Sequence, residues 1–179
     1  MAIAPLPGPG PDLGAEPAAE ATAVPADPGA LLVLAQRDAQ IRAGASWLLW
    51  IAGLSLVNIA AALGDSDFAF ALGLFAAQLV AVLGKTIGVQ AGLPAIGYVS
   101  GVLAAGMSLV FGALWFPARA GKRWVLLVAL VLYGLDLLLL LAILASVGEM
   151  DPIGIGIHAW ALWALFRAWS AAKPIPSIA

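Results

Sequence analysis

The sequence predicts an all-α protein, a polytopic bundle of five transmembrane helices with a disordered N-terminal tail. The first observation is composition: 63% of the 179 residues are hydrophobic and 10% are charged, whereas soluble domains carry about 25% charged residues. The mean hydropathy of +1.04 agrees with this. The second observation is that the apolar residues fall into blocks close to the roughly 20 residues that span a bilayer. No block shows the period-2 alternation of a barrel strand, so the blocks are predicted to be helices.

Residues 1–29 are rich in proline, alanine and glycine and are mildly acidic. Such a segment has too little apolar surface to offset its ordering entropy, which predicts a disordered tail. Residues 30–45 then place Leu31, Leu34, Asp38 and Arg42 at near-helical spacing. This pattern predicts an interfacial amphipathic helix, and an N-terminal extension of the first span would give the same pattern.

Residues 46–173 form the predicted bundle, followed by a C-terminal tail at 174–179. Glycine, proline and charged residues separate the apolar blocks, as links between spans would, and tryptophans gather near block ends, as in an aromatic belt. The second block is short and contains Gly73 and Gln78, so a re-entrant segment is the alternative to a full span there. The five predicted spans are Ser46–Leu63, Phe68–Gly84, Ala95–Phe116, Trp124–Val147 and Ile153–Trp169.

The basic residues indicate an orientation for this bundle in the inner (plasma) membrane. With five crossings, one side carries Arg119, Lys122, Arg123, Arg167 and Lys173, and the other carries Arg37, Arg42 and Lys85. The positive-inside rule then favours an N-terminus outside the cell and a cytoplasmic C-terminus. A re-entrant second block would change the parity and put Arg37 and Arg119 on one side.

Composition also disfavours several kinds of partner and cofactor. The net charge is −2 and the basic residues are scattered, so nucleic acid is not an expected partner. The chain has no cysteine and one histidine, too few ligands for a zinc site, so no metal or other cofactor is expected. Membrane lipids are the expected partners. Small residues four apart, such as Gly73, Ala77 and Ala81, allow close helix contact within the bundle, in a homo-oligomer or with a partner membrane protein.

Several polar residues are predicted to lie at membrane depth. Asp136 stands near the middle of the fourth block, Tyr133 precedes it by one turn on the same face, and Gln78 and His158 fall at similar depth. Asn58 lies in the first block, where an amide usually binds a neighbouring backbone carbonyl. An ionised aspartate at the middle of a transmembrane helix costs about 2.5–3.5 kcal/mol on insertion scales, which predicts a partner for Asp136. The cluster is either a structural clip joining the last two helices or a site that relays protons or binds a polar ligand.

The segment "GYVSG" places Ser100 about a turn and a half into the third span, and His158 enters the fifth span to a comparable depth. This arrangement resembles rhomboid proteases, in which a GxSG serine pairs with a histidine on a later helix. The resemblance implies a Ser100–His158 dyad, with Asn58 in the place of an oxyanion-hole asparagine. The chain departs from it in having five blocks instead of six, one extra residue in the motif, and Leu54 where a histidine would precede Asn58. These departures favour a protein with no catalytic residue over a degenerate hydrolase.

A second resemblance covers Trp47 to Trp169. The stretches "WIAGLSLVN", "VLYGLDLLLLL" and "IGIHAWALWALFRAW" resemble a family of small bacterial integral membrane proteins without an assigned activity. Its YxLD and H-A-x-L elements correspond to Tyr133, Asp136, His158 and Leu162, with one more residue before Leu162 in this chain than in H-A-x-L. The resemblance implies a bacterial inner-membrane protein and singles out Asp136 and His158. The predicted function is a membrane-embedded binding, transport-accessory or assembly component, with a small proton or solute carrier as the first alternative and the hydrolase as the second.

Overall fold

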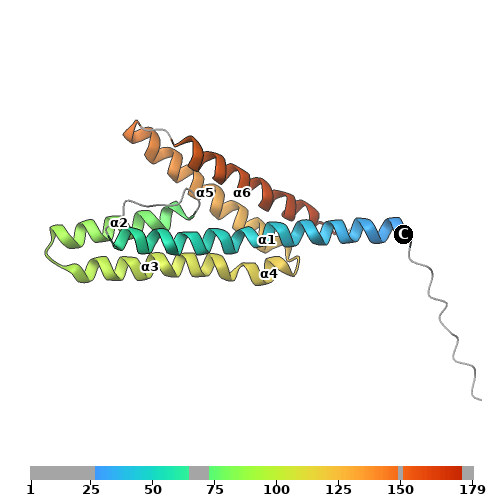
Figure 1. Cartoon of the computed structure of the whole chain (residues 1–179), viewed down its shortest axis with the longest axis horizontal. Helices are drawn as coiled ribbons and strands as arrows, with labels where there is room; N and C mark the ends of the chain where they lie inside the picture. Colours follow the sequence, from blue (N-terminus) through green and yellow to red (C-terminus); the bar gives the residue numbers. More distant parts are fainter. Residues whose placement is uncertain (1–26, 65–72, 149–150, 175–179) are drawn as a thin grey trace, which may run out of the picture.

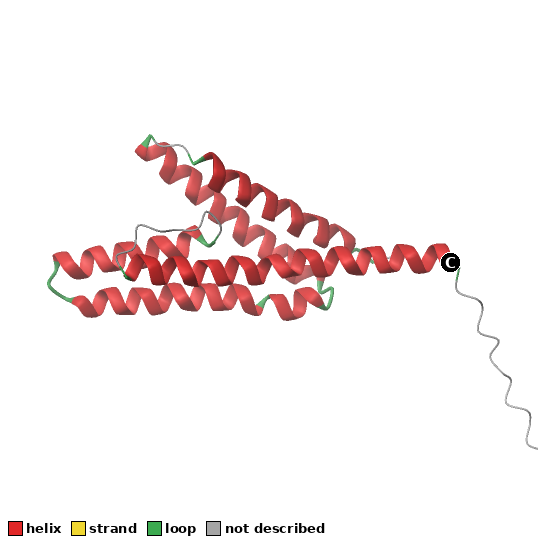
Figure 2. Ribbon diagram, viewed as in Figure 1, coloured by secondary structure: helices red, strands yellow, loops and turns green. Residues whose placement is uncertain are grey.

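The computed structural model describes residues 27–64, 73–148 and 151–174, and within these ranges the chain is helical without β-strands (Figures 1 and 2). Leu114 alone separates the short fourth helix from the third, so the two follow one another along the bundle. The all-α prediction is confirmed for these ranges. The helices are α1 (Pro28–Leu63), α2 (Phe75–Gln90), α3 (Pro94–Ala113), α4 (Trp115–Arg119), α5 (Arg123–Val147) and α6 (Pro152–Ala171).

The helix ends follow local sequence signals. Asp27 accepts a hydrogen bond from the Gly29 N–H at 3.0 Å, and Asp151 accepts one from the Gly154 N–H at 2.8 Å. Each aspartate precedes a proline at the first helical position, where the missing N–H costs nothing. α1 therefore begins two residues inside the predicted tail, whose residues 1–26 lie outside the described ranges, as do residues 175–179 of the predicted C-terminal tail.

Within the described ranges, three helical segments are long and apolar enough to cross a membrane, namely Pro28–Leu63, Pro94–Arg119 and Arg123–Val147. α1 is continuous over 36 residues, so predicted segments 30–45 and 46–63 form one helix without a break at residue 45. α2 has 16 residues and is therefore about 24 Å long, which is shorter than the hydrocarbon core of about 30 Å.

The second predicted span is wrong in its bounds. The prediction covers residues 68–84, of which 68–72 lie outside the described ranges, whereas α2 begins at Phe75 and continues to Gln90. Lys85, predicted to lie in a link, is inside the helix, and its ammonium group donates hydrogen bonds to the Ala62 and Leu63 carbonyls at 2.9 and 3.1 Å. These carbonyls end α1 and lack helical partners, so the lysine charge is satisfied without ending α2.

α1 runs through the centre of the bundle and contacts α2, α3, α4 and α6. In Figure 1, α2 and α3 lie along one half of α1, while α5 and α6 run obliquely and meet α1 toward its N-terminal half. Contacts between small residues permit this approach. A side chain at Gly44 would overlap Ala168 of α6, and one at Gly84 would overlap Ser100 of α3.

The two described ends of the chain lie at the same end of the bundle. The Arg37 guanidinium, near the start of α1, donates hydrogen bonds to the Ala171 carbonyl at 3.0 and 2.7 Å and also contacts the Lys173 carbonyl. Figure 1 shows the C-terminal end of α6 approaching α1 near this end. An arrangement with five crossings requires residues 37 and 171 on opposite faces of a membrane. The alternative in which the second block is re-entrant puts Arg37 and Arg119 on one side and is compatible with this contact.

Candidate functional site

The start of α2 lies inside the bundle, beside the C-terminal third of α1. A side chain added at Gly73 would sit 3.0 Å from the Asn58 amide nitrogen and 3.3 Å from the Ser55 hydroxyl oxygen. α1 ends at Leu63, so the chain at Gly73 has returned by about 13 Å along α1 from Gly64. Gly73 has φ +154°, a conformation that favours glycine. The glycine thus turns the chain into α2 at a point where an added side chain would force its neighbours to shift.

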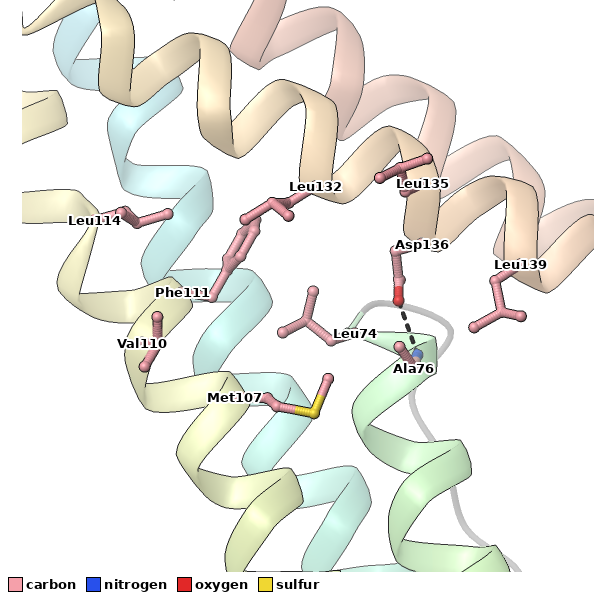
Figure 3. A pocket seen from close by; sticks show the side chains of 10 residues that line it. All are labelled: Leu74, Ala76, Met107, Val110, Phe111, Leu114, Leu132, Leu135, Asp136 and Leu139. Carbon is pink, nitrogen blue, oxygen red and sulfur yellow. Dashed lines mark hydrogen bonds between the residues drawn. The ribbon is translucent and has the colours of Figure 1, made fainter.

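Three consecutive backbone N–H groups at this helix start are bound by side chains of other helices. Ser55 of α1 accepts from the Leu74 N–H at 2.6 Å and donates its own proton to the Ile51 carbonyl at 2.5 Å. Asp136 of α5 accepts from the Phe75 N–H at 2.9 Å with one oxygen and from the Ala76 N–H at 2.8 Å with the other. Figure 3 shows the Asp136 carboxylate pointing at this first turn. Asp136 therefore caps α2 from another helix.

Such capping answers a specific physical need. The first N–H groups of any helix have no partner within the helix, and without water each unsatisfied group costs several kcal/mol. The helix dipole places positive potential at the same point, which favours a carboxylate there. Asp136 lies about 20 Å along α5 from Arg123 and about 17 Å from Val147, and is 5% exposed. The buried acid and the buried helix start therefore satisfy each other.

His158 and Tyr133 complete the cluster around Asp136. The His158 ring lies parallel to the Tyr133 ring, with centroids 4.9 Å apart. Its Nδ1 is 2.9 Å from the Gly154 carbonyl, which can only accept, so Nδ1 carries a proton. Its Nε2 lies 3.4 Å from an Asp136 oxygen. Within the described residues, neither this nitrogen nor the Tyr133 hydroxyl has a hydrogen-bond partner.

The structure brings most of the predicted polar residues together, with one change of role. Asp136, His158 and Tyr133 are in contact, and Asn58 packs beside the same helix start. The predicted clip between Asp136 of α5 and His158 of α6 is a weaker contact than the one between Asp136 and α2. Both oxygens of the Asp136 carboxylate bind α2, whereas His158 Nε2 makes no hydrogen bond within the described residues. Gln78 lies one turn further along α2, half-buried, and its side chain makes no hydrogen bond to the described residues.

The Ser100–His158 dyad is not formed. The Ser100 hydroxyl donates to the Gly97 carbonyl at 2.9 Å, and Ser100 packs against Gly84, nine residues beyond the start of α2. His158 instead contacts Asp136, and Asp136 binds the start of α2. The serine and the histidine are thus separated by about two and a half helical turns of α2, and the catalytic hypothesis has no geometric basis.

A cavity of about 430 Å³ opens beside Asp136, between α2, α3 and α5 (Figure 3). Its volume falls within the range of about 300–1,000 Å³ for ligand pockets. Among the described residues of its lining, Asp136 is the one that is charged, and the other side chains are apolar. Among them Met107, Leu132 and Leu135 are 40%, 46% and 56% exposed, so the cavity opens on the side of the bundle. The lining comprises Leu74, Ala76, Met107, Val110, Phe111, Leu114, Leu132, Leu135, Asp136 and Leu139.

Sequence reasoning missed three parts of this site: Ser55, Lys85 and the backbone N–H groups that Asp136 binds. One serine in an apolar run, such as Ser55, carries little signal. Backbone groups carry none. Gly73 in a short block was the available sign of an interrupted helix.

Comparisons of the chain with protein-family models, with curated proteins and with solved structures give no significant match. The helix geometry and the side-chain contacts therefore carry the functional argument.

Proposed function

We propose that the chain is an integral membrane protein with four crossings and one half-helix. α1, α3 with α4, α5 and α6 cross the bilayer, and α2 enters from and returns to the face where α1 ends. Its parallel course beside α1 supports this, since Leu74 contacts Ser55 and Lys85 contacts Leu63. The termini then share one face. That face carries Arg37, Arg42, Arg119, Lys122, Arg123, Arg167 and Lys173, while Lys85 lies at the other.

The positive-inside rule places this basic face in the cytoplasm. The N-terminus and the C-terminus are then both cytoplasmic. The inner membrane of a bacterium is the location implied by the resemblance of the segment from Trp47 to Trp169.

The function that the geometry supports best is a membrane-embedded binding component that takes an apolar ligand in the cavity beside Asp136. The observation that carries this proposal is that both Asp136 oxygens already bind α2. The carboxylate therefore offers little to a ligand, and the remaining lining is apolar. A ligand with a buried charge or several hydrogen-bonding groups would lose its hydration there without compensation. Long-chain, uncharged molecules fit this lining.

A photoactivatable long-chain alcohol tests the proposal. In detergent, the wild-type protein is expected to label saturably at the cavity, with competition by unlabelled alcohol. Met107→Trp fills the cavity and is expected to reduce this labelling at least fivefold. Leu109→Trp adds the same bulk to the same helix at an exposed position outside the lining, and is expected to leave labelling unchanged. Labelling that does not saturate, or that falls equally in both variants, would refute ligand binding in this cavity.

One observation favours a second candidate, a proton carrier. The His158 Nε2 and the Tyr133 hydroxyl lie buried next to Asp136 and lack hydrogen-bond partners within the described residues, as groups that exchange a proton would. Proton flux into liposomes containing the protein separates the candidates. The binding proposal predicts no flux above protein-free liposomes. Flux that is present in the wild type and lost in Asp136→Asn would establish the carrier instead.

A further inference from the structure

A second hollow lies at the basic end of the bundle, between α1 and α6, and is separate from the cavity beside Asp136. Its volume is about 440 Å³. The helices approach closely at its floor, because a side chain at Gly44 would overlap Ala168 and sit 2.8 Å from the Ala164 carbonyl oxygen. We refer to it as the α1–α6 groove. Its polar and aromatic lining consists of Gln36, Gln40, Trp47, Trp160, Trp163 and Arg167.

The α1–α6 groove changes character along its length. The two helices run antiparallel, since Arg37 contacts Ala171 and Gly44 faces Ala168. Gln36, Gln40 and Arg167 therefore lie toward the end of the bundle, and the tryptophans lie deeper. Trp160 and Trp163 are 63% and 55% exposed, so the aromatic part is open on its side. The groove is polar and cationic at one end and apolar at the other.

Arg167 is the charged group of this groove that has no partner among the described residues. Nearby, Arg42 pairs with Asp38 at 2.8 Å, and Arg37 donates two hydrogen bonds to the Ala171 carbonyl at the end of α6. Arg167 makes no ion pair or hydrogen bond with any part of the chain that the structure describes. A guanidinium presents several N–H donors in a geometry that matches phosphate oxygens. The free charge therefore calls for an anion at the polar end of the groove.

We propose that the α1–α6 groove binds one anionic phospholipid of the cytoplasmic leaflet. Its phosphate lies at Arg167 and the glutamine amides, and an acyl chain follows the tryptophans into the bilayer. This inference rests on the proposed membrane orientation, which puts the groove at the leaflet where anionic lipids attract basic residues. Tryptophan is suited to the interface between headgroups and chains. The amphiphilic groove thus matches an amphiphile with a negative headgroup.

Native mass spectrometry of the full-length protein in detergent tests this proposal. The protein is titrated with phosphatidylglycerol, with phosphatidylcholine of the same acyl chains, and with inorganic phosphate. The expected result is one phosphatidylglycerol bound at least tenfold more tightly than phosphatidylcholine, and no retained phosphate. Arg167→Gln is expected to remove most of this preference, and Arg167→Lys to restore part of it. Trp163→Ala is expected to weaken binding of both lipids.

Lys122→Gln is the matched control, because it removes one positive charge from an exposed residue at the same end of the bundle but outside the groove. It is expected to keep the wild-type preference. Equal binding of the two lipids, an equal loss in Arg167→Gln and Lys122→Gln, or retention of free phosphate would each overturn the proposal. None of these results would bear on the direction of α2 or on labelling at Met107, so the two proposals fail separately.

Discussion

The Asp136 carboxylate oxygen accepts the Ala76 N–H at 2.8 Å, which links the middle of α5 to the first turn of α2. The residue at the N-cap position of α2 is Leu74, whose side chain cannot bind the N–H groups of the first turn. The acidic side chain of another helix takes its place. This contact explains how a helix can begin inside an apolar bundle.

Replacing Asp136 is expected to destabilise the protein in a graded way. Asp136→Leu leaves the Phe75 and Ala76 N–H groups without acceptors, at about 1–3 kcal/mol for each group. Asp136→Asn keeps one carbonyl oxygen and turns an amide toward the other N–H, so its loss should be smaller but measurable. Thermal unfolding in detergent, followed by tryptophan fluorescence, gives the order. Equal and negligible shifts in both variants would contradict the cap.

Ser55 offers an independent test of the same helix start. Ser55→Ala removes the acceptor of the Leu74 N–H, and an unfolding cost of about 1–3 kcal/mol is expected. Ser146→Ala removes an exposed hydroxyl that bonds only to the Ile143 carbonyl of its own helix. Its unfolding temperature should match the wild type. A loss for Ser146→Ala as large as that for Ser55→Ala would show that hydroxyl removal alone, and not the contact with α2, sets the cost.

Gly73 is expected to tolerate no side chain. Gly73→Ala combines a strained backbone with a methyl group 3.0 Å from Asn58, and a cost of about 1–3 kcal/mol for the backbone alone is typical. Gly53 lies inside α1 with nothing within 4 Å of an added methyl group. Gly53→Ala should therefore be neutral or raise stability by about 0.5–1 kcal/mol through helix propensity. The difference between the two unfolding temperatures is the quantity to measure.

Lys85 is expected to stabilise the junction of α1 and α2. Lys85→Met keeps most of the side-chain length but removes the hydrogen bonds to the Ala62 and Leu63 carbonyls, and hydrogen bonds from charged donors contribute about 1.5–3 kcal/mol when buried. The position is partly exposed, so a loss near the lower value is predicted. Lys122→Met, at an exposed lysine, is the comparison. Equal unfolding temperatures for the two variants would argue against this role.

The helical class and several site residues could be predicted from the sequence because apolar runs and a carboxylate within them carry strong signals. Asp136 was expected to need a partner, since burial of a charge is costly. The identity of that partner could not be predicted, because backbone N–H groups are present at every residue. The number of crossings could not be predicted for a related reason: a short apolar block has the same composition whether it crosses the bilayer or returns. The proposed return of the chain rests on Gly73 and Lys85, whose contacts with α1 the sequence does not reveal.

The direction of α2 is the central claim, and the accessibility of Gly64 and Gln90 tests it most directly. The chain has no cysteine, so Gly64→Cys and Gln90→Cys each introduce one reactive thiol at an exposed position, with Ala35→Cys and Ala120→Cys as references for the basic face. In intact cells, a membrane-impermeant maleimide is predicted to label residues 64 and 90 alike and to leave residues 35 and 120 unlabelled until the membrane is opened. Labelling of residue 64 without residue 90, or of residue 90 without residue 64, would mean that α2 crosses the membrane and would contradict the half-helix.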